Sequence, residues 1–237
     1  MAEWFERVDD AIWYNLADRA VDKKEALFII KALNLDVGEA VLDAPCGNGR
    51  ISLHLARHGC KLTGVDINSR FLFKARRKLA IANLGASFVN RDLRDLNIIG
   101  EFDAIVNWFG SFGYFSDQEN LDVLSSFRDA LKFQGRLLID QPNRENLLRN
   151  LHKIRPLAGA EMQIRWQRKS QQLVADWTLN ADPKKQTFRT LIRLYTPTQF
   201  SDILRRTGFK LEKVYGNANG DPFTKTSKRY ILVARKI

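Results

Sequence analysis

Short apolar runs alternate with segments of helical spacing along residues 39–142. Each run is bounded by turn residues, which is typical of a strand buried inside a sheet. Between the runs, apolar residues recur every three or four positions, as on a helix with one buried face. Strands are therefore predicted at 39–45, 61–67, 86–92, 102–109 and 136–142, and helices at 5–33, at 49–59, from Asn68 or Ser69 onward, and at 117–131. Gly135 is expected to stop the chain before the fifth strand.

The pattern changes after residue 145, where single apolar and polar residues alternate. This alternation predicts a small antiparallel meander with one apolar face, because side chains of a strand point to opposite sides in turn. The other face is expected to carry arginines. The alternating segments are 161–168, 173–179 and 188–194, and the arginines are Arg165, Arg189 and Arg193.

The chain ends with one predicted helix and two predicted strands. Thr196 suits the cap of the helix, Pro197 its first position and Gly208 its end. FKLEKVYG and RYILVARK then predict a long-looped hairpin at the sheet edge. Strands that alternate with helices favour the α/β class, here a Rossmann-like, seven-stranded sheet with helices on both faces. Ligands of such sheets bind beyond the carboxyl ends of the strands.

The amino-acid composition mainly excludes classes of protein. With 45% hydrophobic and 27% charged residues, the chain is typical of a globular protein. No apolar run approaches the roughly 18 residues of a membrane span, and MAEWFERVDD lacks the features of a secretory signal. A cytoplasmic protein without a membrane partner is expected. Neither a disulfide scaffold nor a metal site is predicted, because Cys46 and Cys60 show no ligand spacing with the three histidines.

The net charge is +11, and the whole excess of basic residues lies in 141–237. Such asymmetry has two interpretations. The basic region could bind an anionic partner, or it could be a solvated face without a ligand.

The strongest chemical signal is VLDAPCGNGR at 41–50. Asp43 ends a predicted strand, and Gly47 and Gly49 form a tight turn that opens a helix. Free N–H groups at the helix start suit a carboxylate, and Asp43 suits an ammonium. Asp66 ends the next strand, where a carboxylate can bind ribose hydroxyls. An amino acid joined to a ribose describes S-adenosylmethionine better than NAD, since the third glycine of G-x-G-x-x-G is absent.

Four segments together resemble the class I S-adenosylmethionine-dependent methyltransferases. VLDAPCGNGR resembles motif I of that family, and VDIN resembles its acidic ribose-binding motif II. NRDLRDL resembles the segment whose Asp reads the adenine amino group, and NWFGSFGYF is similar to a stretch of a subgroup that includes amino-sugar N-methyltransferases. Two positions depart from the family pattern, Pro45 and Arg91, where the family usually has Gly.

The resemblance implies one cofactor, S-adenosyl-L-methionine, and a set of residues that contact it. The expected cofactor-binding residues are Tyr14, Asp43, Ala44, Gly47, Asn48, Gly49, Asp66, Ile67, Asp92, Leu93, Asn107 and Trp108. The candidates for a catalytic role are Tyr114, Tyr14 and His152, although each is also compatible with a purely structural role. The loop with Trp108, Phe109, Phe112 and Phe115 is expected to line the adenosine and methyl region rather than to belong to the core.

We expect a single methyltransferase domain spanning 1–237. Its predicted parts are an N-terminal helical cover (1–35), a cofactor-binding core (36–144), an antiparallel insertion that covers the substrate and the active site (145–195), and a C-terminal helix with edge strands (196–237). The sequence makes no prediction of the oligomeric state.

Three functions remain open from the sequence. The first is methylation of a nitrogen or oxygen of a small acceptor, which the basic region predicts to be anionic. The lack of an obvious general base favours nitrogen, because a neutral amine needs little base catalysis. The second is RNA methylation through the basic C-terminal half. The third is a non-enzymatic cofactor-binding or scaffold role, against which the intact motifs I and II argue.

Overall fold

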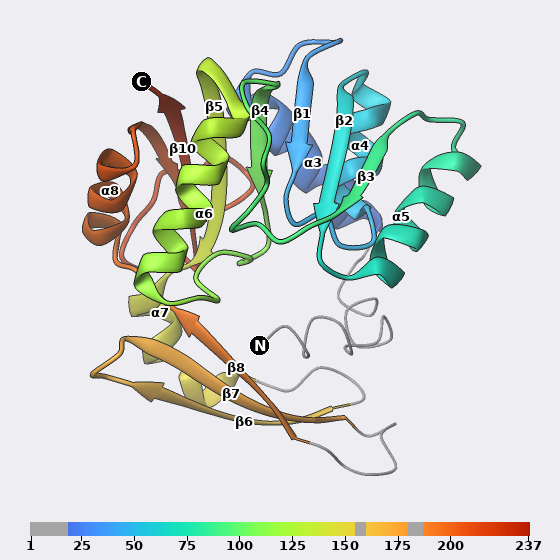
Figure 1. Ribbon diagram of the computed structural model, residues 1–237. Coiled ribbons are helices and arrows are strands. Elements are labelled where there is room, and N and C mark those ends of the chain that lie inside the picture. The colour runs from blue at the N-terminus through green and yellow to red at the C-terminus, as the bar shows by residue number, and fades with distance from the viewer. Residues whose placement is uncertain (1–18, 155–159, 180–186) are drawn as a thin grey trace.

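The computed structural model describes residues 19–154, 160–179 and 187–237 (Figure 1). Its main element is a seven-stranded sheet in the order β3-β2-β1-β4-β5-β10-β9. All neighbouring pairs are parallel except those of β10, which runs antiparallel to β5 and β9. The strands are β1 (Ala40–Asp43), β2 (Lys61–Asp66), β3 (Ser87–Asn90), β4 (Phe102–Asn107), β5 (Leu131–Pro142), β9 (Phe209–Tyr215) and β10 (Arg229–Lys236).

Helices cover both faces of this sheet, as predicted. Buried residues of α3 (Arg19–Leu33), α4 (Arg50–His58) and α5 (Ser69–Ile81) form one apolar cluster with the sheet. Buried residues of α6 (Asp117–Ala130) and α8 (Pro197–Arg206) form a second cluster. The two clusters share the strands between them, so the strands read as near-continuous apolar runs.

Local capping explains where two of these helices begin. The Ser116 hydroxyl accepts a hydrogen bond from the Glu119 backbone N–H, and the Glu119 carboxylate accepts one from the Ser116 backbone N–H. These two bonds form a capping box at the start of α6. Thr196 and Gln199 form the same arrangement at α8, with Pro197 at the first position. The prediction of the α8 start is therefore confirmed.

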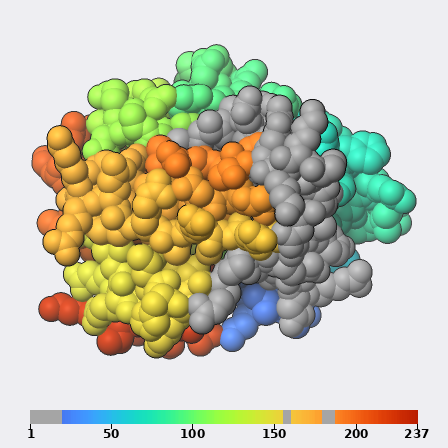
Figure 2. All heavy atoms as spheres, turned by 90° about the horizontal axis from the view of Figure 1, so that it is seen from below, coloured from blue at the N-terminus to red at the C-terminus, as the bar shows by residue number. Residues whose placement is uncertain are grey.

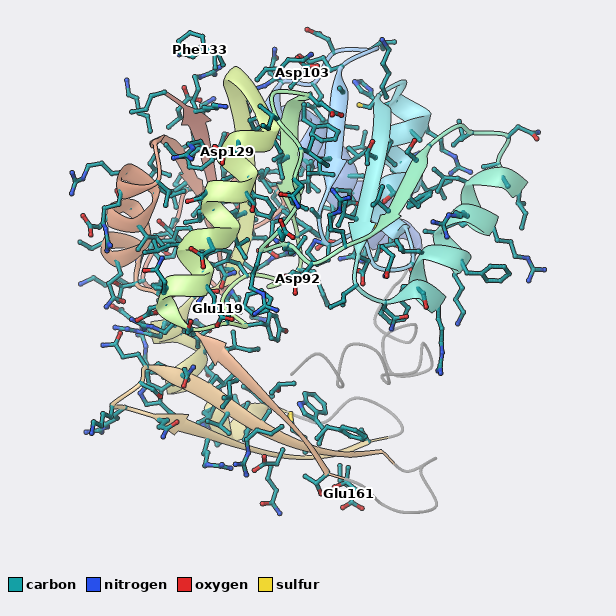
Figure 3. The ribbon with its side chains drawn as sticks, viewed as in Figure 1. Asp92, Asp103, Glu119, Asp129, Phe133 and Glu161 are labelled. Atoms are coloured by element: carbon teal, nitrogen blue, oxygen red, sulfur yellow. The ribbon has the colours of Figure 1, made fainter. Side chains whose placement is uncertain are left out.

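The predicted meander is confirmed as a second, three-stranded antiparallel sheet of order β6-β7-β8. It lies beyond the carboxyl ends of the main strands (Figure 1), and Figure 2 shows its residues spread over that side of the molecule. Arg165 and Arg189 share one face and both pair with Asp176, at 2.6 Å each. On that same face Glu161 points away from the main sheet (Figure 3). The strands are β6 (Ala160–Gln167), β7 (Gln172–Leu179) and β8 (Thr187–Arg193).

Two local predictions were wrong. Gly135 does not stop the chain, because β5 already begins at Leu131, where α6 ends. The extra residues form an irregularity opposite β4, in which Gln134 has a φ of 62°. A short helix, α7 (Arg144–Arg149), and a 3-10 turn (Leu151–Lys153) follow β5, where no helix was predicted. Six residues are too few for helical spacing to be recognised in a sequence.

Within the described residues, no helix is both long and apolar enough to cross a membrane.

Candidate functional site

A cavity of about 490 Å³ lies where the turns after β1, β2, β3 and β4 meet. This is the edge at which parallel α/β sheets bind ligands. The side chains around it are of mixed character, with carboxylates, arginines and aromatic rings. Its described lining consists of Asp43, Pro45, Cys46, Gly47, Asn48, Arg50, Ile51, Asp66, Ile67, Phe71, Arg91, Asp92, Leu93, Arg94, Trp108, Phe109, Ser111, Tyr114, Phe115, Ser116 and Glu119.

The turn after β1 contains a buried carboxylate and two glycines. Asp43 is 2% exposed and accepts a hydrogen bond of 2.5 Å from the Ser52 hydroxyl. Burial raises the pKa of Asp43 to about 7 despite that bond. Gly47 has a φ of 53°, and a Cβ placed on it would meet no atom within 4 Å, so the backbone is open toward the cavity.

The turn after β2 is tied to the first turn through Asp66. One carboxylate oxygen accepts the backbone N–H of Gly47 and the other that of Asn68, both at 2.8 Å. Burial raises the pKa of Asp66. The Asn68 side chain in turn caps α5 by accepting from Arg70 and Phe71. The two strand ends therefore form one rigid unit around the cavity.

Asp92 follows β3 and is engaged by Arg94. One Asp92 oxygen accepts the Arg94 backbone N–H (2.9 Å) and Nε (3.1 Å), and the other accepts Nη2 (2.7 Å). The Arg94 guanidinium lowers the pKa of Asp92. Arg94 also pairs with Glu119 and lies over the Phe115 ring, 4.5 Å from its centroid. A single arginine therefore joins three parts of the cavity wall.

A network of ion pairs supports the wall on the side of α3. Arg50 bonds Asp22 and Glu25, each at 2.8 Å. Glu25 also accepts hydrogen bonds from the Trp108 indole N–H (2.7 Å) and from Arg229 Nη1 (2.5 Å). Side-chain hydrogen bonds from Arg50, Trp108 and Arg229 outweigh the opposing burial and lower the pKa of Glu25. The network fixes Trp108, which is 3% exposed, at the edge of the cavity.

The aromatic loop after β4 divides between cavity and core. Phe109, Tyr114 and Phe115 line the cavity, whereas Phe112 is buried against Tyr195 and Phe200. For Phe112 the expectation of a cavity-lining role was therefore wrong, because α8 supplies an apolar surface that the loop sequence does not reveal. Burial raises the pKa of Tyr114 to about 12, so its hydroxyl stays protonated at neutral pH.

The structure brings most of the predicted cofactor-binding residues to the cavity. Ala44 and Asn107 are fully buried instead, with the Asn107 amide donating to the Ala44 carbonyl (2.8 Å). Gly49 packs against Ala75. Asp43, Gly47, Asn48, Asp66, Ile67, Asp92, Leu93 and Trp108 line it.

The candidates for catalysis are less well placed. Tyr114 lines the cavity, but His152 lies in the 3-10 turn and is absent from the described lining. Tyr14 lies outside the described residues. Among the residues that the structure describes, no cluster of His, Cys, Asp or Glu could hold a metal ion.

Four further side chains line the cavity that were not predicted from the sequence: Arg50, Phe71, Arg94 and Glu119. For Arg94 a signal existed, since it follows Asp92 by two residues within the same motif. Glu119 was detectable only as part of a capping box, and its distance of 25 residues from Arg94 gave no hint of their contact.

Part of this chain is similar to known methyltransferases. Residues 41–135 match the family described as "Methyltransferase domain". A glycine/sarcosine/dimethylglycine N-methyltransferase from Actinopolyspora halophila is 35% identical over 141 residues, which are 57% of this chain and 25% of that protein. The chain spans between 18% and 55% of the length of eight curated relatives that it matches.

Solved structures share the fold over nearly the whole chain. The CcbJ methyltransferase from Streptomyces caelestis has a TM-score of 0.74 at 20% identity, covering 91% of this chain and 95% of that one. CalS10 from Micromonospora echinaspora, described as an amino pentose methyltransferase with bound S-adenosylmethionine, has a TM-score of 0.61 at 17% identity, covering 93% and 92%. At these identities the likeness shows the fold alone.

Proposed function

We propose that this chain, whose residues 41–135 match a methyltransferase domain and whose fold is that of class I methyltransferases, transfers a methyl group from S-adenosylmethionine to a nitrogen or oxygen of a small anionic molecule. The observation that carries the proposal is the joined pair of strand ends, in which Asp66 holds the Gly47 backbone beside the buried Asp43. The SFGYF segment and the likeness to CalS10 support the subgroup of amino-sugar methyltransferases. RNA methylation is not favoured, because the glycine/sarcosine/dimethylglycine N-methyltransferase and the amino pentose methyltransferase act on small molecules.

The residues around the cavity fit this cofactor. The open backbone at Gly47 leaves room for an aminoacyl tail, and the buried Asp43 suits its ammonium group. A carboxylate has about four lone-pair sites, so Asp66 can accept a ribose hydroxyl in addition to its backbone donors, Gly47, Ile67 and Asn68. The Asp92 carboxylate accepts three hydrogen bonds from Arg94, which leaves one of its about four lone-pair sites for the adenine amino group.

The contribution of the protein is mainly binding and positioning. The cofactor, when bound, supplies a methyl group already activated on a sulfonium. The joined strand ends fix its orientation, and Trp108, Phe109 and Tyr114 exclude water from the reacting end of the cavity. Correct orientation alone can account for roughly 7–11 kcal/mol of such a barrier.

The side chains around the cavity favour a nitrogen acceptor. A hydroxyl acceptor needs a base, but Tyr114 is a hydrogen-bond donor at neutral pH, because its pKa is about 12. Asp43 accepts from Ser52 at the inner end of the turn. No histidine is found among the described lining residues. A neutral amine needs only positioning, and the Tyr114 oxygen can accept one of its N–H groups while the amine lone pair stays free to attack.

Calorimetry with S-adenosylmethionine tests the cofactor assignment. We expect Asp66→Ala to weaken binding at least about tenfold, the equivalent of about 1.4 kcal/mol. Ser87→Ala serves as a control, because Ser87 is exposed on β3 and absent from the described cavity lining. Absence of binding by the unaltered protein, or unchanged affinity in a folded Asp66→Ala variant, contradicts the proposal. A screen of small amines and alcohols with methyl-labelled cofactor then identifies the acceptor.

A further inference from the structure

Three hydrogen-bond donors converge on one neutral oxygen outside the cavity. The Gln171 side-chain carbonyl accepts from Arg193 Nη1 (2.7 Å), from Gln199 Nε2 (3.0 Å) and from Arg144 Nη1 (3.2 Å). A carbonyl oxygen has two lone pairs, so three donors exceed its capacity. Two of the donors belong to positively charged groups, for which an anionic oxygen is a better acceptor than an amide.

Arg144 is the least well satisfied of these groups. Its bond to Gln171 is long, and its second bond, to the Gln199 carbonyl, is 3.4 Å. That carbonyl already accepts the Thr196 backbone N–H at 3.0 Å. Among the described residues, Arg144 forms no ion pair, whereas Arg193 pairs with Asp117 at 2.9 Å. Burial, and then the neighbouring Arg193 charge, lower the pKa of Arg144.

Gln171, which supplies the shared oxygen, has an unfavourable backbone conformation. Gln171 lies in the turn between β6 and β7 with a φ of 52°, in the left-handed region that few residues other than glycine adopt. Its backbone carbonyl accepts the Leu194 N–H at 3.2 Å, which fixes the turn against the end of β8. The Gln171 side chain is half-buried, so it has a path to solvent while the turn stays in place.

We propose that Arg144, Arg193 and Gln199 form a binding site for a phosphate-sized oxyanion, which the Gln171 amide oxygen occupies in the free protein. An incoming oxyanion offers several charged acceptor oxygens in place of one neutral oxygen, and it supplies a counter-charge for Arg144, which has no ion-pair partner among the described residues. Gln171 swings out toward solvent when the anion enters. The site belongs to the basic part of the chain, whose other arginines on the second sheet, Arg165 and Arg189, are already paired with Asp176.

The site lies directly behind the wall of the cavity. The Arg193 backbone N–H donates to the Gly113 carbonyl at 2.7 Å, and the next residues, Tyr114 and Phe115, line the cavity. The oxyanion has two possible sources, a phosphate or carboxylate of the methyl acceptor or a free anion that acts as an effector. The first source rests on the proposed function, but anion binding itself does not.

Calorimetric titration with inorganic phosphate, at ionic strength held constant with sodium chloride, tests the site. We expect the full chain to bind phosphate, Arg144→Gln to bind it at least about tenfold more weakly, and Gln171→Gly to bind it more tightly because the competing oxygen is gone. Arg149→Gln is the matched control. Arg149 lies on the same short helix, and its side chain is 57% exposed. The affinity of Arg149→Gln for phosphate should therefore equal that of the unaltered chain.

Three outcomes overturn the inference: no phosphate binding by either the unaltered chain or Gln171→Gly, equal weakening by Arg144→Gln and Arg149→Gln, or weakening by Gln171→Gly. Circular dichroism of each variant excludes misfolding. Binding of S-adenosylhomocysteine, measured separately, distinguishes a failed cofactor assignment from a failed anion site.

The source of the anion is decided by turnover with matched acceptors that differ only in a phosphate group. A preference for the phosphorylated member that Arg144→Gln abolishes assigns the site to the acceptor. Phosphate binding without such a preference assigns it to a free anion. Both results support the site.

Discussion

Asp43 is a buried carboxyl whose ionisation opposes folding. Its pKa is about 7 in the folded chain and 3.8 in its ordinary state, so the folded chain binds its proton more tightly. This contribution to stability is fully present below pH 4 and is lost as the pH rises toward 7. In the cofactor-free protein, the free energy of unfolding of Asp43→Asn should therefore rise relative to that of the unaltered chain between pH 5 and pH 7, by about 1.4 kcal/mol for each pH unit, and level off by pH 8. Urea unfolding at these pH values measures the difference, and a gain independent of pH would refute the assignment.

Gly113 has no room for a side chain. Its φ is 95°, and a Cβ there would overlap the Arg193 backbone carbonyl. We expect Gly113→Ala to lower the free energy of unfolding by more than about 2 kcal/mol, because strain and overlap add. Gly110→Ala is the control: it also has a positive φ, 69°, but its Cβ would meet only Pro142, at 3.5 Å. Gly110→Ala should lower the free energy of unfolding by about 1 kcal/mol. Equal losses for the two variants in urea unfolding would show that the overlap at Gly113 is relieved at no cost.

The first turn of α6 joins helix stability to cofactor binding. Ser116 caps the helix and lines the cavity, and its partner Glu119 pairs with Arg94, which holds Asp92. We expect Ser116→Ala to cost about 1 kcal/mol of folding free energy and also to weaken cofactor binding.

The capping box of α8 provides a control for this coupling. Thr196→Ala removes the same kind of cap, but Thr196 is absent from the described lining of the cavity. It should cost similar stability, about 1 kcal/mol, with unchanged cofactor affinity. Denaturation and calorimetry on both variants separate the effects, and equal affinities would show that α6 does not position Asp92.

Individual elements differ in how far the sequence predicts them. The ends of β1 and β2 were predictable because apolar runs terminate in Asp43 and Asp66 beside glycines, which are local signals. The irregular start of β5 was not, because it depends on pairing with β4. The Arg94–Glu119 contact and the burial of Phe112 against α8 likewise arise from tertiary packing between segments distant in sequence. Thus the two strand ends beside the cavity can be predicted from the sequence, whereas the contacts that hold the cavity wall together require the structure.

Across the whole molecule, two distant parts of the chain meet in a buried ion-pair network. Glu25 of α3 and Arg229 of β10 are 204 residues apart in sequence, yet they form a bond of 2.5 Å. Arg229 also pairs with Asp140 of β5 and lies 4.4 Å from the centroid of the Trp108 ring. One guanidinium therefore holds α3, β5 and β10 together behind the cavity wall.

Removing that guanidinium leaves two carboxylates, Glu25 and Asp140, which are 5% and 2% exposed. We expect Arg229→Met to destabilise the fold by about 3–5 kcal/mol, because an unpaired buried charge costs more than the pair contributes. Arg235→Met removes an arginine from the same strand whose partner, Glu212, is 29% exposed, and its loss should be about 0–1 kcal/mol. Urea unfolding compares the two variants. Glu25 keeps its pair with Arg50 in the Arg229→Met variant, whereas Asp140 has no other ion pair among the described residues. Adding Asp140→Asn to Arg229→Met should therefore restore part of the lost stability, because it removes the uncompensated charge. A further loss instead would show that the bond from the Phe109 backbone N–H to Asp140 matters more than the charge.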